Sequence, residues 1–407
     1  MPSLSPPRPS ELRALCLVLW NWSKYCQNCP DAKSDKGLDV SQCNNAICPF
    51  QAKWLVRRQA FLNFYQNCTS GYSSDTTSNK TAVLQTHQDL LDIISFLKTL
   101  QASTYTRKQC IDEYFKASDP LNQIFSVRDQ EQAFLLAAHI MTMVSLVPSK
   151  VLSAASLPAG RKEKVLVVFP DAVWDEDKSL HNAIRSAFVK RTQNKLQGNT
   201  RDAARIQADL TAANLIRRAK LEIHGTDELR KHLMLRHTHL YVFRHIGFLK
   251  ELLMSTKEEE VQPNQGPPAL PREVALEALE TLYTLFPRSD GVKTSKLLER
   301  LIREQDFDSD YMRSPTRVHE RQNEASSING FPIWGERLMV LYEEIQSPSP
   351  RNWIEEWLDE KTRPSYGTAI AVAGIFVALV TSFLALIVSS FQAVVAWNQW
   401  KYPVSPQ

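Results

Sequence analysis

The sequence predicts a mainly α protein with a small α+β segment and a C-terminal single transmembrane helix. Three observations support this fold class. Only 12 glycines occur in 407 residues, which disfavours a turn-rich β architecture. Apolar residues recur at helical spacing through much of the chain. The third observation is that residues 364–400 contain no charged side chain.

The uncharged segment near the C-terminus predicts a membrane anchor. Residues 369–388 form an apolar run that only Thr381 and Ser382 interrupt. A bilayer core about 30 Å thick needs roughly 20 such residues as helix, because a backbone in lipid must bond to itself. We expect a transmembrane helix over residues 366–390 and an interfacial tail over residues 391–407. The residues expected to span the bilayer include Ile370, Gly374, Phe376, Leu379, Phe383 and Leu386.

The residues around the anchor predict its orientation. An amphipathic helix over residues 351–363 is expected to lie on the lipid surface through Trp353 and Trp357. Three basic residues occur within residues 351–363, and only Lys401 follows the span. Because basic residues favour the cytoplasmic side, we expect a tail anchor with the bulk of the chain in the cytosol.

Three glycosylation sequons oppose this topology. They begin at Asn21, Asn67 and Asn79 and would be acceptors only if the N-terminal part were lumenal. Such triplets arise often by chance, so the cytosolic prediction is retained.

The N-terminal part contains all seven cysteines. Residues 1–9 predict a disordered leader, and residues 10–148 predict a helical domain with helices over residues 10–25, 50–68, 81–100 and 130–147. Four cysteines follow the pattern C-x2-C-x13-C-x4-C, which suits tetrahedral zinc, although the second spacing is longer than in a CxxC pair. Free thiols and disulfides remain alternatives, and a reducing cytosol disfavours disulfides. The candidate zinc ligands are Cys26, Cys29, Cys43 and Cys48.

The central part, residues 149–256, predicts a small α/β segment with a basic surface. Strands are expected over residues 164–169, 220–225 and 240–243, with helices after Asp175 or Asp177 and over residues 226–235 and 247–254. Residues 181–220 contain nine Lys or Arg against two Asp. This charge predicts a solvated face or a surface for anionic lipid, whereas nucleic acid is disfavoured because no recognition motif accompanies it. The candidate lipid-surface residues are Arg185, Lys190, Arg191, Arg217 and Arg218.

No recognised catalytic motif occurs in the chain. A P-loop, a dinucleotide-binding glycine motif, an HExxH pair and a nucleophile elbow are all missing. An enzyme of unrecognised class would require a deep pocket in residues 160–255, lined by Asp171, His224 or His237. His237 and His239 alternate as on a strand, but the neighbouring sequence supplies no carboxylate or cysteine to complete a metal site.

After a linker over residues 257–271, residues 272–350 predict a further helical domain. Its helices are expected over residues 272–286, from Ser295 onward, and over residues 334–345.

Several short segments in the C-terminal half resemble segments of a known protein family. They include Ile223-His-Gly-Thr-Asp-Glu-Leu229, the stretch from Leu270 to Leu279, Trp334-Gly-Glu-Arg-Leu338 and Phe391-Gln-Ala-Val-Val-Ala-Trp397. On these pieces the chain resembles a family of uncharacterised filamentous-fungal membrane proteins over roughly residues 200–405. The resemblance implies a membrane-attached, mostly helical protein and brings no activity with it.

Together these features predict a membrane-anchored, non-enzymatic protein that binds a protein partner or organises a membrane surface. The first alternative is a zinc-binding module that uses the N-terminal cysteines, and the second is the unrecognised enzyme.

Overall fold

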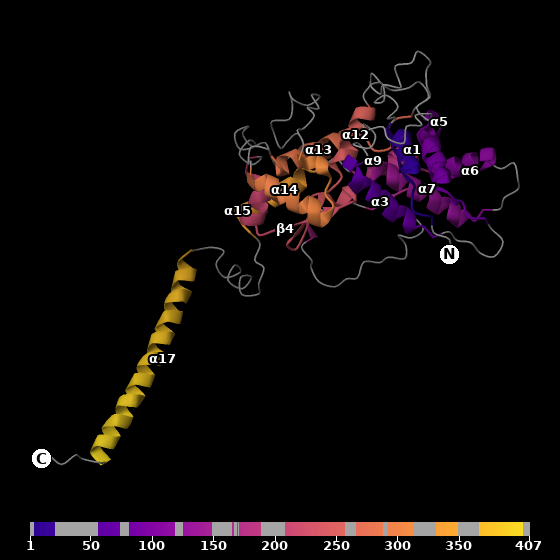
Figure 1. Ribbon diagram of the computed structural model, residues 1–407. Coiled ribbons are helices and arrows are strands. Elements are labelled where there is room, and N and C mark those ends of the chain that lie inside the picture. Colours follow the sequence, from indigo (N-terminus) through magenta and orange to yellow (C-terminus); the bar gives the residue numbers. More distant parts are fainter. Residues whose placement is uncertain are drawn as a thin grey trace. The chain divides into compact units, whose positions relative to one another are not determined.

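The computed structural model describes residues 4–20, 56–73, 81–118, 125–148, 165–166, 169, 171–188, 208–256, 266–287, 292–312, 331–348 and 366–401. The chain divides into two compact units, Met1–Ser347 and Pro348–Gln407. The described part is mostly helical with a small sheet component, as predicted (Figure 1).

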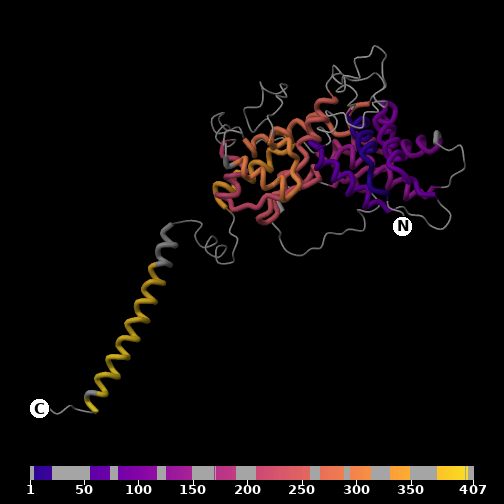
Figure 2. The backbone as a smooth tube through the Cα atoms, viewed as in Figure 1, coloured from indigo at the N-terminus to yellow at the C-terminus, as the bar shows by residue number. Residues whose placement is uncertain are grey.

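The first half of the larger unit is a group of packed helices, drawn in indigo to purple in Figure 2. Helix α4 shows how the sequence forms them. Thr86 accepts a hydrogen bond from the Asp89 amide while the Asp89 carboxylate accepts from the Thr86 amide, so the helix begins at a capping box. Its buried face, which includes Leu90 and Ile94, packs against α1 and α7. The helices of this group are α1 (Pro9–Trp20), α3 (Gln59–Ser70), α4 (His87–Leu97), α5 (Leu100–Thr104), α6 (Arg107–Ser118) and α7 (Val127–Thr142).

A four-stranded mixed sheet follows, in the order β2-β5-β6-β4. Strands β4 (Glu222–Thr226) and β6 (His239–Phe243) are parallel, whereas β5 (Met234–Arg236) runs antiparallel to β6 and to β2 (Val165–Leu166). A separate parallel pair joins β1 (Leu146–Val147) to β3 (Ala172–Val173). Helices α9 (Leu180–Ala187) and α11 (Ala212–Arg217) connect these strands along the chain.

The prediction of a helix over residues 226–235 is wrong. The segment instead contains a 3-10 turn, η4 (Leu229–Lys231), and strand β5. Its first residue after β4, Asp227, accepts hydrogen bonds from the guanidinium of Arg244 at 2.5 and 2.7 Å and contacts His245 at 2.5 Å. Burial alone would raise the pKa of Asp227, but these hydrogen bonds lower it to about 2. Tertiary contacts therefore override the helix-forming local sequence.

The remaining helices of the larger unit share one apolar core with the first group. They are α12 (Ile246–Ser255), α13 (Arg272–Leu285), α14 (Val292–Gln305), the 3-10 helix η7 (Ser309–Met312) and α15 (Gly335–Gln346). The Trp20 ring of α1 lies 6.1 Å from the Phe248 ring of α12, centroid to centroid. The three domains expected within residues 10–350 thus contribute to a single buried cluster.

Two buried charged side chains attach α15 to this core. The Glu277 carboxylate of α13 accepts hydrogen bonds from the amides of Ile333 at 2.7 Å and Trp334 at 2.6 Å, just before α15 begins. The Arg337 guanidinium of α15 donates to the backbone carbonyls of Arg230 and His232. Helix α15 is therefore bonded to both α13 and the turn that leads into β5.

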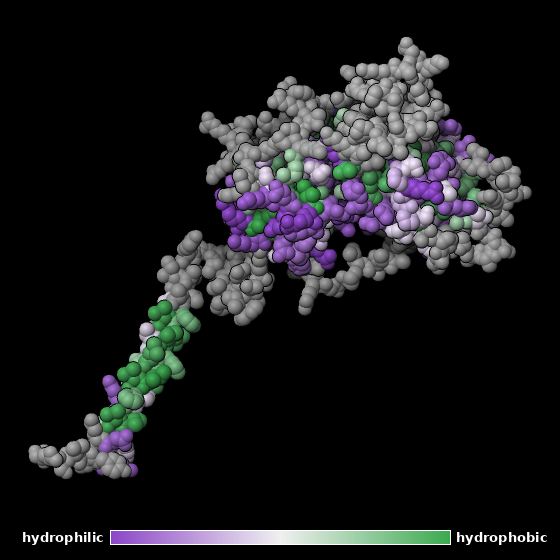
Figure 3. Space-filling model, viewed as in Figure 1, coloured by the Kyte–Doolittle hydropathy of each residue, from purple (hydrophilic) through white to green (hydrophobic). Residues whose placement is uncertain are grey.

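The smaller unit contains α17 (Tyr366–Lys401), within which Gly374–Asn398 is long and apolar enough to cross a membrane. That segment has a mean hydropathy of 2.3 and exposes its apolar side chains, which Figure 3 shows as a mostly hydrophobic surface. Of the residues expected to span the bilayer, Gly374, Phe376, Leu379, Phe383 and Leu386 are exposed, and Ile370 also lies in α17. The helix continues past residue 391 without interruption, so the first part of the expected interfacial tail is a direct extension of the span.

Arg58 is the centre of a buried charge cluster that joins segments distant in the sequence. Its guanidinium lies 2.5 Å from Glu251 of α12 and 2.8 Å from Asp310 of η7, and its side chain is only 1% exposed. Removing one partner of a buried ion pair leaves the others charged without compensation, which costs about 3–5 kcal/mol.

We therefore expect Arg58→Met to lower the free energy of unfolding by about 3–5 kcal/mol. The measurement is urea unfolding of the full chain in detergent, followed by tryptophan fluorescence. Arg8→Met, at an exposed position just before α1, is the control and should change stability little. A loss below about 1 kcal/mol for Arg58→Met would contradict the role given to this cluster.

Candidate metal centre

The solvent-facing side of the sheet brings two histidines and a carboxylate together. In the parallel pair, Glu222 of β4 lies beside His239 of β6, and His224 lies beside Tyr241. Successive side chains of a strand point to opposite faces. Ile223 is accordingly buried in the core, while Glu222, His224 and His239 face outward and are 40–67% exposed.

The three side chains converge on one point. His224 Nε2 lies 3.7 Å and His239 Nδ1 lies 3.4 Å from Glu222 Oε2. The two imidazole rings are perpendicular, with centroids 4.5 Å apart. One donor atom from each residue lies within 4.8 Å of the other two. Ligands bound to zinc at 2.0–2.1 Å in a tetrahedral arrangement are about 3.4 Å apart, so the observed spacing suits a first-row divalent ion.

The two facing ring nitrogens have no hydrogen-bond partner. His224 Nε2 and His239 Nδ1 are each shielded from solvent, although the rings themselves are partly exposed. A shielded nitrogen without a partner is costly unless something binds it. Two imidazoles and a carboxylate suit Zn²⁺ and related transition metals, and three protein ligands leave a coordination position open.

The edge of strand β4 is held by the last residue of α14. Gln305 donates from Nε2 to the Ile223 carbonyl at 2.8 Å, and its Oε1 accepts from the Gly225 amide at 2.7 Å. The amide side chain thus replaces a neighbouring strand along this edge. A Cβ at Gly225 would lie 2.9 Å from the Phe307 ring, so glycine permits this close approach. These contacts fix the backbone that carries Glu222 and His224.

The sequence prediction found only part of this site. It singled out His237 and His239, but His237 has a positive φ of 53° and lies between β5 and β6. The second histidine is instead His224, and the carboxylate is Glu222, both from a strand distant in sequence. The alternation Glu222-x-His224 indicates that both side chains lie on one face of a strand. Only the register of β4 against β6 shows that His239 lies beside them.

The other predicted site residues are not gathered into one place by the described structure. Cys26, Cys29, Cys43 and Cys48, the basic pair Lys190 and Arg191, and Trp353 and Trp357 lie outside the described residues. Arg185 belongs to α9, whereas Arg217 and Arg218 are at the end of α11. Arg218 already pairs with Asp209 at 3.5 Å.

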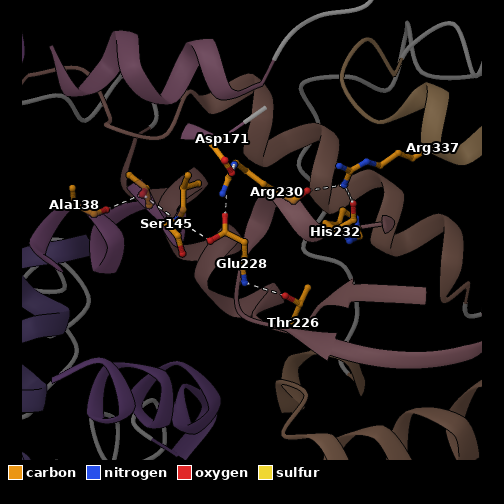
Figure 4. Close-up of polar contacts among 10 residues, drawn as sticks. Ala138, Ser145, Asp171, Thr226, Glu228, Arg230, His232 and Arg337 are labelled. Atoms are coloured by element: carbon orange, nitrogen blue, oxygen red, sulfur yellow. Dashed lines mark hydrogen bonds and ion pairs between the residues drawn. The ribbon is translucent and has the colours of Figure 1, made fainter. Parts of the chain in front are cut away.

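Asp171, one of the residues considered for an enzyme site, takes part in a polar network that joins elements of the fold (Figure 4). Asp171 contacts Arg230 at 3.5 Å, and Arg230 also binds Glu228, which accepts from the Ser145 amide. Nearby, His232 bonds to Thr281 and to the Phe243 amide, and burial lowers its pKa well below the usual value. A neutral histidine with both nitrogens bonded serves packing.

No family model, curated protein or solved structure matches this chain. The site is therefore classified by its own geometry, as an open surface site of two imidazoles and one carboxylate.

We expect Gln305→Ala to loosen the edge of β4, because the Gly225 amide and the Ile223 carbonyl each lose a partner. The cost of such a loss is about 1–3 kcal/mol. Hydrogen–deuterium exchange should show faster exchange at Gly225, with Gln88→Ala on the exposed face of α4 as the control. Unchanged protection at Gly225 would show that Gln305 does not hold the strand.

Proposed function

We propose that this protein is a membrane-attached metal-binding protein. Helix α17 crosses a membrane, and the Met1–Ser347 unit binds one divalent transition-metal ion through Glu222, His224 and His239. The observation that carries the proposal is the convergence of three donor atoms, two of them shielded nitrogens without hydrogen bonds.

A simple ion pair between the same groups explains the geometry less well. Charge-assisted hydrogen bonds from nitrogen to carboxylate measure about 2.7–2.9 Å. The separations of 3.4 and 3.7 Å are longer than that and agree with the distance between two ligands of one ion. The exposure of the site favours a binding role, because a metal used for chemistry is normally enclosed in a shaped, dry cavity.

Membrane attachment is supported by the length and apolar character of α17. At 36 residues, the helix is about 54 Å long at 1.5 Å per residue, which exceeds a bilayer core of about 30 Å. The resemblance to fungal membrane proteins agrees with attachment. The cytosolic orientation, a protein partner and zinc binding by the N-terminal cysteines all stay predictions.

The metal site is tested by titrating Zn²⁺ into full-length protein that carries serine at Cys26, Cys29, Cys43 and Cys48. We expect one ion per chain by calorimetry, and at least tenfold weaker binding in His224→Ala and in His239→Ala. His181→Ala on α9 is the matched control. Equal affinity in all the histidine variants would contradict the site. A second ion in the protein with intact cysteines would identify the N-terminal cysteines as an additional site.

Topology is tested by glycosidase treatment of the full-length protein expressed in eukaryotic cells. We expect no change in gel mobility, because a tail anchor leaves Asn21, Asn67 and Asn79 in the cytosol. Thr69 of the second sequon is also buried and donates to the Tyr65 carbonyl. A mobility shift that disappears when the three asparagines are changed to Gln would place the N-terminal part in the lumen.

A further inference from the structure

A cavity of about 110 Å³ lies between four helices of the larger unit, away from the metal centre. The ends of α1 and α4, the side of α7, the end of α12 and the segment before α13 enclose it. Its lining is mainly apolar, with one ammonium group and two hydroxyls. The lining includes Leu19, Lys98, Met141, Leu252, Gly266 and Ala269.

Lys98 is the charged group of this cavity. Its ammonium group donates to the carbonyls of Val18 and Leu19 in the last turn of α1, where the helix dipole favours a positive charge. An ammonium group has three N–H donors, so one donor is left after these two bonds. Burial lowers the pKa of Lys98 to about 8, and no carboxylate of the described residues pairs with it.

The segment before α13 packs closely against the end of α4, and Arg272 at the start of α13 bonds to the end of α12. The Gly266 amide donates to the Lys98 carbonyl at 3.0 Å, and a Cβ at Gly266 would lie 2.8 Å from the Thr99 carbonyl oxygen. Arg272, the first residue of α13, donates to the Thr256 hydroxyl at 2.9 Å and to the Leu253 carbonyl at 2.6 Å. The lining residues from α1, α7 and the end of α12 are all uncharged; they are Leu19, Trp20, Met141, Leu252, Ser255 and Thr256.

We propose that this cavity binds a small monocarboxylate with a short apolar chain, whose carboxylate accepts the remaining N–H of Lys98. The two carbonyl oxygens offset only part of the cost of burying the ammonium group, since burial still lowers its pKa, and an anion would offset more of that cost. The apolar walls take the chain and disfavour a fully hydrated inorganic anion. A dry cavity of 150 Å³ holds benzene, so about 110 Å³ admits roughly four to six non-hydrogen atoms. This inference is independent of the metal site.

The experiment uses metal-free, full-length protein in detergent with sodium butyrate as the probe and calorimetry as the readout. Butyrate is expected to bind at least tenfold more tightly than 1-butanol or inorganic phosphate. Its affinity should fall as the pH rises above about 8, because Lys98 then loses its proton. Lys98→Met should lower butyrate affinity at least tenfold, whereas Lys108→Met on the exposed side of α6 should not.

A second variant separates loss of the site from loss of the fold. Ala269→Leu fills the cavity and leaves Lys98 in place, so it should also abolish binding while the circular dichroism spectrum is unchanged. Equal binding of butyrate and 1-butanol, equal binding of phosphate, or unchanged affinity in a folded Ala269→Leu variant would each overturn the proposal.

Discussion

The buried guanidinium of Arg58 is the interaction on which the larger unit depends. It brings α3, α12 and η7 to a single point, because Glu251 and the two aspartates of the Asp308–Asp310 turn face the same guanidinium. Asp308 also accepts from the Gly247 amide at 2.9 Å, and a Cβ at that glycine would overlap both Arg58 and Asp308. Once the turn is fixed in this way, Gln305 just before it meets the edge of β4. The charge cluster in the core and the outward-facing candidate metal ligands are thus connected through a few residues of one turn.

Local sequence was sufficient to predict those helices whose sequence signals all lie within the helix itself. The helices expected over residues 81–100 and 272–286 correspond to α4 and α13, and the uncharged C-terminal run corresponds to α17, because a capping box, an apolar stripe or a long apolar run is visible in one window. Prediction from local sequence was wrong over residues 226–235, where partners outside that segment decide the conformation. Asp227 is bonded to Arg244 and His245, and β5 is paired on both sides. Arg244, His245 and strand β2 all lie outside residues 226–235, so the pattern within that window could not show them.

The candidate metal site could not be predicted from the sequence for a related reason. Glu222 and His239 are distant in the chain, and a parallel register of β4 against β6 makes them neighbours. A shift of one residue in that register would place a buried position beside Glu222, because side chains alternate between faces. Ile223 and Leu240 oppose such a shift, since both are buried in the core. The apolar face of the sheet therefore sets the positions of the ligands on its polar face.

The way in which α15 is attached to the larger unit determines how that unit would resist a pull on the chain. Helix α15 is the last helix of the larger unit, and the chain continues from it toward α17. Tension applied to the chain at α17 would reach the larger unit first through α15. Glu277 and Arg337 would bear that load, and they connect to α13 and to the backbone at Arg230 and His232. Because the bonds lie on opposite sides of the helix start, a pull on the chain would be shared between the helical layer and the sheet rather than peeling one helix away.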